Sequence, residues 1–193
     1  MRKTLAVGHF LNAPFIDICA PYLERIREIF FAWPGVLSCR PSPEFTPELK
    51  NRFLADLRWA RENGLKLDTL FNCNCYGDKA ISREIADFAD RVLSEMDKER
   101  LYPDIVTTTS PFLATMFRRN HPSVKIRLSV NMRVHGTSGF EPIMDLFDSN
   151  EQMYIKVANG ESYDLLIPSD YMIQRLISEG LVQPLNKDNL NCF

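Results

Sequence analysis

Cysteine is scarce in this sequence, with five residues in a chain of 193. Their number is odd and none of them belongs to a Cys-x-x-Cys pair. This pattern argues against a disulfide framework and against a tetrahedral zinc site. A reducing cytoplasm is therefore the expected location.

Long apolar runs and an excess of positive charge are also missing. No stretch reaches the roughly 18 apolar residues that a membrane span needs, and the short apolar run before His9 does not predict a signal peptide. The formal net charge is -2, whereas proteins that bind nucleic acid through bulk charge carry basic stripes. We expect neither a membrane nor a nucleic acid as partner.

Known catalytic signatures are absent too. The sequence contains no Ser-His-Asp order, no phosphate-binding glycine loop and no helical metalloprotease motif. The motifs alone therefore assign no catalytic residue.

What the chain does contain is a repeated alternation of strand and helix patterns. Strands are expected at residues 4–8, 36–39, 67–71, 104–106, 124–134 and 163–167. Helices are expected at 17–31, 46–63, from 82, 110–121, 140–147, 149–157 and 171–179. The fold class is α/β, with a mainly parallel sheet of about six βα units. Six units fall short of a closed eight-stranded barrel, so we expect an open sheet or a partial TIM-barrel that self-associates to bury its edges.

The stretch Leu67–Asp78 is the most informative one for a site. Its apolar strand ends in Asn72, Cys73, Asn74 and Cys75, and a helix follows. Ligands of α/β proteins bind where the carboxyl ends of the strands meet. Polar residues after the strands predict a small-molecule or anion site, with these candidates: His9, Arg40, Asn72, Asn74, Thr109, Ser129, Asn131 and Arg133.

Several of these candidates have an ordinary structural alternative. Cys73 and Cys75 point the same way from a strand end, so they are either metal or cluster ligands or two small buried side chains. His9 and His135 are either general bases or solvated residues at strand ends. Arg133 needs an anionic partner, either a side chain or a ligand. The hydroxyls at 107–110 form either an anion-binding site or an ordinary helix cap.

Residues 1–148 resemble the collagenase-like peptidase family of unknown catalytic type. The resemblance lies in these phrases: Phe30–Gly35, Leu67–Gly77, Asp104–Pro111, Ser129–Arg133 and Gly139–Glu141. It implies a barrel fold and a peptidase, hence hydrolase, label. Some relatives use iron–sulfur clusters, but their cluster cysteines lie mostly beyond the region covered here. The resemblance therefore gives no reason to expect a cofactor.

Residues 147–190 resemble the periplasmic spermidine/putrescine-binding proteins instead. The resemblance lies in these phrases: Phe147–Tyr154, Tyr163–Met172, Arg175–Leu181 and Gln183–Leu185. It implies a polyamine cleft in which Ser169 and Tyr171 line the ligand, although the second lobe of that family is missing. The sequence thus predicts a chimera of residues 1–148 and 149–193, joined near Phe147-Asp148-Ser149. A polyamine-binding module and a scaffold without a ligand are the alternatives to a peptidase-like protein.

Overall fold

The structure is a computed structural model, and it describes residues 5–38, 45–129, 131–132, 145–150, 177–178 and 180. The chain divides into two compact units, Met1–Glu151 and Gln152–Phe193. In the second unit, Ile177 and Ser178 are helical, as the sequence predicts for 171–179. The Gly180 amide donates to the Ile177 carbonyl at 3.1 Å, and Gly180 has a φ of +67°, a backbone conformation that favours glycine.

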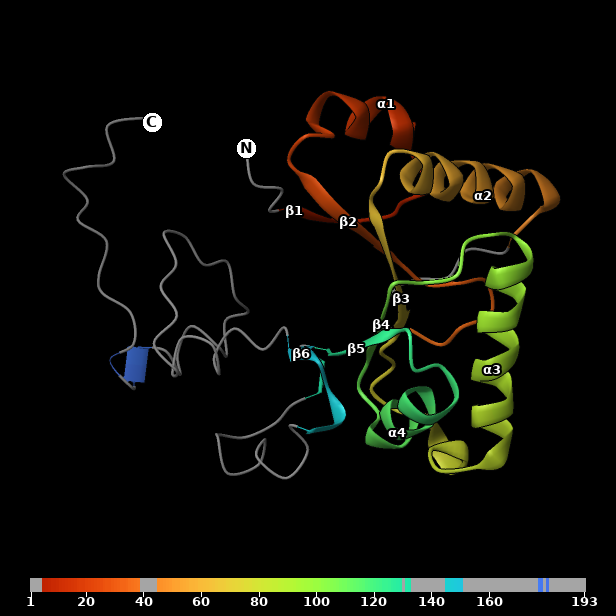
Figure 1. The fold of residues 1–193 in the computed structure, drawn as a ribbon, viewed down its shortest axis with the longest axis vertical. Coiled ribbons are helices and arrows are strands. Elements are labelled where there is room, and N and C mark those ends of the chain that lie inside the picture. Colours follow the sequence, from red (N-terminus) through yellow and green to blue (C-terminus); the bar gives the residue numbers. More distant parts are fainter. Residues whose placement is uncertain are drawn as a thin grey trace. The chain divides into compact units, whose positions relative to one another are not determined.

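The first unit contains a six-stranded sheet whose strands are all parallel and follow one another in chain order. The strands are β1 (Leu5–Gly8), β2 (Ile26–Phe31), β3 (Lys66–Phe71), β4 (Ile105–Thr108), β5 (Lys125–Leu128) and β6 (Ser149–Asn150). Parallel neighbours in chain order require crossovers of one hand, which put the helices on one face. Figure 1 shows α2 (Pro47–Glu62), α3 (Arg83–Lys98) and α4 (Pro111–Asn120) along the same side of the strands. The α/β fold class expected from the sequence is confirmed.

The three long helices begin where the sequence predicts a cap. The Thr46, Ser82 and Ser110 hydroxyls accept hydrogen bonds from main-chain amides at 3.3, 3.3 and 3.2 Å, respectively. Each cap satisfies an amide that has no partner inside its helix, and such a cap stabilises by about 1 kcal/mol. Proline follows Thr46 and Ser110 at the first helical position, where it loses no hydrogen bond.

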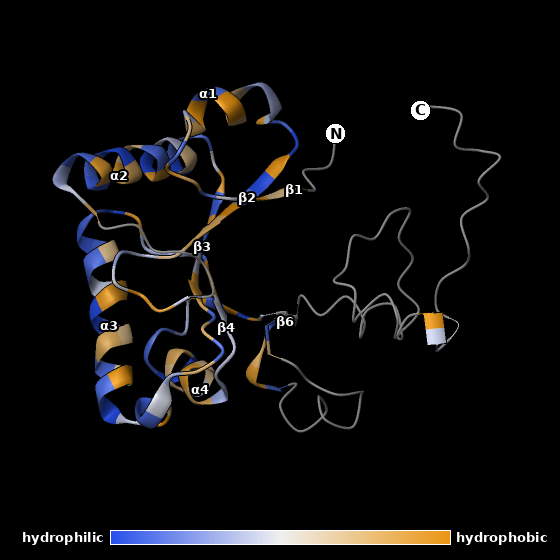
Figure 2. Cartoon of the chain, turned by 180° about the vertical axis from the view of Figure 1, so that it is seen from behind, coloured by the Kyte–Doolittle hydropathy of each residue, from blue (hydrophilic) through white to orange (hydrophobic). Residues whose placement is uncertain are grey.

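The core lies between these helices and the sheet. Phe53 of α2 packs edge-on against Phe31 of β2, with ring centroids 5.7 Å apart. Phe71 of β3 packs against Phe117 of α4, with ring centroids 5.1 Å apart. On α3, Val92, Leu93 and Met96 are buried, and Figure 2 shows its hydrophobic residues on the side that faces the strands. None of the described helices is long and apolar enough to cross a membrane.

The first predicted helix, residues 17–31, is wrong in its second half. The structure has a short helix α1 (Phe15–Cys19), a 3-10 turn η1 (Ala20–Tyr22) and then β2. Ile26, Ile29 and Phe31 are buried. A strand covered on both faces is apolar without strict alternation, and this spacing imitates a helical one. The strand predicted at 36–39 is also wrong, because residues 36–38 have no regular structure.

Two later predictions need correction as well. The fifth strand ends at Leu128 rather than at 134, and the chain then turns, with the Met132 amide donating to the Ser129 carbonyl at 3.1 Å. The helix cap predicted at Ser149 is wrong because Ser149–Asn150 form β6 beside β5. The strand at 163–167 and most of the helix at 140–147 lie outside the described residues.

Candidate functional site

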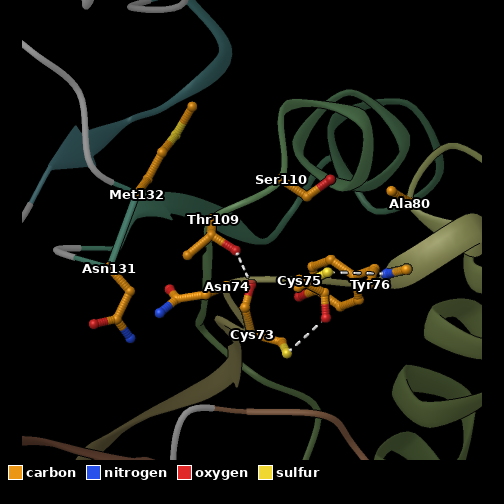
Figure 3. Close-up of a pocket in the computed structure, with 10 residues that line it drawn as sticks. Cys73, Asn74, Cys75, Tyr76, Ala80, Thr109, Ser110, Asn131 and Met132 are labelled. Atoms are coloured by element: carbon orange, nitrogen blue, oxygen red, sulfur yellow. Dashed lines mark hydrogen bonds between the residues drawn. The ribbon is translucent and has the colours of Figure 1, made fainter.

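A pocket of about 620 Å³ opens at the carboxyl ends of β3, β4 and β5 (Figure 3). This volume is within the range of small-molecule sites. The pocket lies where the sequence predicts a site. It is lined by Cys73, Asn74, Cys75, Tyr76, Gly77, Ala80, Thr109, Ser110, Asn131 and Met132.

Two half-buried hydroxyl residues fix the loop that follows β3. The Tyr76 hydroxyl donates to the Phe71 carbonyl at 2.5 Å, and the Thr109 hydroxyl donates to the Cys73 carbonyl at 2.6 Å. Burial raises the pKa of Tyr76 to about 12, so this phenol stays protonated and keeps donating at neutral pH. The loop from β3 is thereby tied to its own strand and to the end of β4.

The two thiols of the loop face the pocket rather than the core. Cys75 is exposed and Cys73 is half-buried. The Cys73 thiol donates to the Cys75 carbonyl at 3.0 Å, and the Gly77 amide donates to the Cys75 sulfur at 3.4 Å (Figure 3). The interpretation of this pair as two buried apolar side chains is therefore wrong.

Two amide side chains complete the polar part of the wall. Asn74 is exposed, and Figure 3 shows its amide turned toward the same side of the pocket as that of Asn131, while Met132 points away. The Asn131 side chain donates to the Asn72 carbonyl at 3.5 Å, and its main-chain amide donates to the Ser129 hydroxyl at 3.2 Å. Asn72 and Ser129 are themselves buried and support the wall from behind.

Ser110 acts as an ordinary helix cap. Its hydroxyl accepts from the Leu113 amide, and its own amide donates to the Thr108 hydroxyl at 3.1 Å. Thr107 donates instead to Asp68. The described contacts of residues 107–110 thus fit the capping interpretation, and only Thr109 and Ser110 reach the pocket.

Beneath the pocket lies a buried ionic cluster that the sequence analysis missed. Arg127 of β5 forms a bidentate pair with Glu28 of β2, at 2.7 and 3.1 Å, and contacts Asp68 of β3 at 3.0 Å. The Thr107 hydroxyl lies 2.9 and 2.8 Å from the two Asp68 carboxylate oxygens. All four residues are buried, at 8% exposure or less. We call Glu28, Asp68, Thr107 and Arg127 the polar layer.

The polar layer lies on the sheet face opposite the helices. Phe71 packs against α4, and Asp68 is three residues earlier, so their side chains point to opposite faces. Thr107 precedes Thr109, which lines the pocket, by two positions, and Arg127 precedes Ser129, which supports the wall, by two positions. Two positions along a strand are one step along the same face. The polar layer is therefore the step immediately below the strand ends.

The charges of this layer are compensated by Arg127 and by the adjacent Arg27. Burial acts to raise the pKa of Glu28, but hydrogen bonds and charge from Arg127 and then Arg27 outweigh it and hold the pKa below its ordinary value. The Arg27 Nε atom lies 3.1 Å from Glu28 Oε2. Two carboxylates and two guanidinium groups thus meet, and Glu28 stays ionised at neutral pH.

The structure does not bring His9 to the pocket. Its Nε2 atom lies 2.9 Å from Asp56 Oδ2 of α2, with both side chains almost fully buried. Its ring packs against those of Phe15 and Phe53, with centroid distances of 4.7 and 5.1 Å, respectively. His9 therefore belongs to the layer between the sheet and the helices, and the prediction that it is solvated at a strand end is wrong.

The remaining candidates lie outside the described residues: Arg40, Arg133, His135, Ser169 and Tyr171. Within the described part of the chain, no group of three or more His, Cys, Asp or Glu side chains is placed to hold a metal ion. Cys73 and Cys75 there supply two sulfur ligands only.

A solved structure of a U32 peptidase matches 95% of this chain and 81% of its own, with a TM-score of 0.56 and 12% sequence identity. This is the collagenase-like peptidase family that residues 1–148 resemble, and the expected α/β fold class agrees with it. At such an identity the likeness shows the fold alone.

Sequence comparison gives a shorter match of a different kind. The spermidine/putrescine-binding periplasmic proteins of Escherichia coli and Salmonella typhimurium are 34% identical over 58 residues. The putrescine-binding periplasmic protein of Escherichia coli is 37% identical over 54 residues. The chain spans only 17% and 15% of the lengths of these relatives. No family model matches the chain.

Proposed function

We propose that this protein binds a small peptide-like ligand in the pocket at the carboxyl ends of β3, β4 and β5. The observation that carries the proposal is that polar side chains from three strand ends line the same cavity. Asn74, Thr109 and Asn131 follow three different strands and line one cavity of about 620 Å³. Polar groups from separate strand ends around one cavity are typical of ligand sites in parallel α/β folds.

The lining chemistry favours an uncharged, hydrogen-bonding ligand. The ten described lining residues include two amides and several hydroxyl and thiol groups, and none of the ten carries a charge. An asparagine side chain both donates and accepts, so it complements a peptide group. A polyamine needs carboxylate partners, and the described lining offers none.

The proposal does not include peptide hydrolysis. The His9 imidazole pairs with Asp56 on the helix side of the sheet, where it cannot activate a nucleophile in the pocket. We therefore propose a binding protein built on a peptidase fold. A polyamine-binding module, supported by the periplasmic relatives, is the second candidate, and a scaffold without a ligand is the third.

Calorimetric titration with three probes separates these candidates. Trialanine represents the peptide-like ligand, spermidine the polyamine and inorganic phosphate a bare anion. We expect heat with trialanine, and Asn131→Ala to weaken its binding about 5- to 10-fold, equivalent to one lost hydrogen bond of ~1 kcal/mol. Asn51→Ala, an exposed position on α2, is the matched control and should bind normally.

The other outcomes each contradict the proposal. Heat with spermidine alone would establish the polyamine-binding module, and heat with phosphate alone would establish an anion site. Absence of binding heat with all three probes would support the scaffold without a ligand. Equal binding by the wild type and Asn131→Ala would move the ligand away from this pocket.

We also propose that the chain is a chimera, with residues 1–148 of the peptidase-like fold and 149–193 related to the polyamine-binding proteins. The 58-residue sequence match to the polyamine-binding proteins supports this origin. The boundary between the two compact units, after Glu151, lies close to the join inferred from the sequence. We retain the cytoplasm as the proposed location.

A further inference from the structure

Two cysteine thiols lie two positions apart on the wall of the pocket. Cys73 and Cys75 both line the cavity, and the chain bends at Asn74 between them. Neither thiol is buried in the core, and neither forms a disulfide. Thiols that are open to a cavity can react with its contents, whereas buried thiols are inert.

The local geometry places the two thiols within reach of each other. Cα atoms two positions apart span at most about 7 Å, and a bend shortens this distance into the range of 4.4–6.8 Å that disulfides adopt. The Cys73 sulfur already lies 3.0 Å from the Cys75 carbonyl oxygen. Formation of the disulfide requires the two side chains to rotate toward each other.

The environments of the two thiols differ in a way that gives them different roles. Cys75 is exposed, and its sulfur accepts a hydrogen bond from the Gly77 amide at 3.4 Å. Disulfide exchange requires access to the attacking sulfur. Cys73 is half-buried, and its hydrogen is engaged by the Cys75 carbonyl. Cys75 is thus suited to attack first and Cys73 to follow.

We infer that Cys73 and Cys75 form a dithiol–disulfide redox pair that reduces a small peptide-like disulfide. In the first step, the Cys75 thiolate attacks one sulfur of the bound disulfide, a mixed disulfide forms and one substrate thiolate leaves. In the second step, the Cys73 thiolate attacks the Cys75 sulfur, the internal disulfide forms and the second substrate thiolate leaves. Two electrons pass from the protein to the substrate, and each departing thiolate takes up a proton.

The inference adds a reaction to the proposed pocket, and its substrate class rests on that proposed function. The internal pairing itself does not, because a small oxidant forms the disulfide without occupying the peptide site. Two oxidants therefore separate the two ideas. The azo compound diamide tests the pairing, and oxidised glutathione, the disulfide of a tripeptide thiol, tests the substrate class.

The sequence makes the readout simple. Trypsin cuts after Lys66 and Lys79, so the peptide 67–79 contains Cys73 and Cys75 and no other cysteine. The reduced full-length protein is exposed to each oxidant, and its remaining thiols are then alkylated under denaturing conditions. After digestion with trypsin, the mass of this peptide is measured by mass spectrometry. An internal disulfide appears as an unalkylated peptide lacking two hydrogens.

We expect both oxidants to give the internal disulfide in the wild type, with no glutathione retained. Cys73→Ser should trap glutathione on Cys75, because the second step is lost. Cys75→Ser should react on the order of tenfold more slowly, because the remaining thiol is less accessible. Cys19 is the internal control: it is 3% exposed, and burial and then the Asp56 charge raise its pKa, so it should stay unmodified.

Three results would overturn the inference. The first is a wild type that retains glutathione on Cys75 beside a free Cys73. The second is equal and independent modification of both thiols. The third is failure of diamide to link them in protein whose circular dichroism shows it folded. Asn131→Ala should slow only the glutathione reaction, so loss of that difference would count against the peptide pocket and leave the pairing intact.

Discussion

Arg127 reaches across the sheet to Glu28, which lies 99 positions earlier in the chain and three strands away. Three strand spacings in a flat sheet amount to about 14 Å, and the side chains of a flat sheet stand parallel to one another. A bidentate pair at 2.7 and 3.1 Å therefore requires the sheet to curl toward the face that carries these side chains. The polar layer is thus evidence for barrel-like curvature from β2 to β5.

The first prediction concerns the stability that this ion pair provides. Arg127→Met leaves the Glu28 and Asp68 carboxylates buried without their main partner, and we expect a loss of about 3–5 kcal/mol in the free energy of unfolding. Urea denaturation at neutral pH measures it. Arg58→Met, at an exposed surface pair with Glu99, is the matched control and should cost at most about 1 kcal/mol. Equal losses in both variants would show that the buried pair has no special role.

The second prediction is the pH dependence of the same pair. Arg127 and Arg27 hold the pKa of Glu28 below its ordinary value of 4.5 in the folded protein. The resulting stability is present above the unfolded pKa and is lost as the pH falls through the folded pKa. Glu28→Gln should therefore flatten the acid limb of a stability–pH curve measured by urea denaturation. Glu62→Gln, at an exposed position of α2, should leave this limb unchanged.

Sequence alone predicted the parts of this fold that depend on near neighbours. The caps at Thr46, Ser82 and Ser110 were found because a hydroxyl and its amide lie three positions apart. The strand end at Asn72 to Cys75 was found because the apolar pattern stops there. These local signals gave the α/β class and the edge of the sheet where the pocket lies.

The polar layer could not be found in this way. Arg127 and Arg133 occupy equivalent positions in the alternation of the predicted fifth strand, so the sequence offered no reason to prefer Arg127. Glu28 was assigned to a helix, since Ile26, Ile29 and Phe30 have helical spacing. Which charges meet depends on pairings 59 and 99 positions apart, which only the strand order determines.

The third prediction concerns Tyr76. Burial raises its pKa to about 12, so the neutral phenol adds stability at and below pH 10, and this stability is lost as the pH rises toward 12. Tyr76→Phe removes the bond to the Phe71 carbonyl and should cost about 1–2 kcal/mol at neutral pH. A difference titration of tyrosinate absorbance, wild type minus Tyr76→Phe, should place the missing group near pH 12. A missing group that titrates at the ordinary tyrosine pKa would contradict the burial of Tyr76.

The fourth prediction is the self-association expected from an unclosed sheet. Among the described strands, β1 pairs only with β2, so its outer edge presents main-chain groups without a strand partner in that set. Leu5 is 45% exposed on β1, and Ile18 and Tyr22 nearby in sequence are 46% and 55% exposed. An exposed apolar sheet edge is a template for pairing with another chain. We expect light scattering to give a mass above that of a monomer, rising with concentration.

Charge on this edge provides the test of where the contact lies. Leu5→Lys places a charge on β1, and charged side chains on edge strands suppress pairing. This variant should shift the scattering mass toward that of the monomer, whereas Ile81→Lys, at an 80% exposed position between β3 and α3, should leave it unchanged. A strictly monomeric wild type would refute self-association. An oligomer that survives Leu5→Lys would place the interface elsewhere than β1.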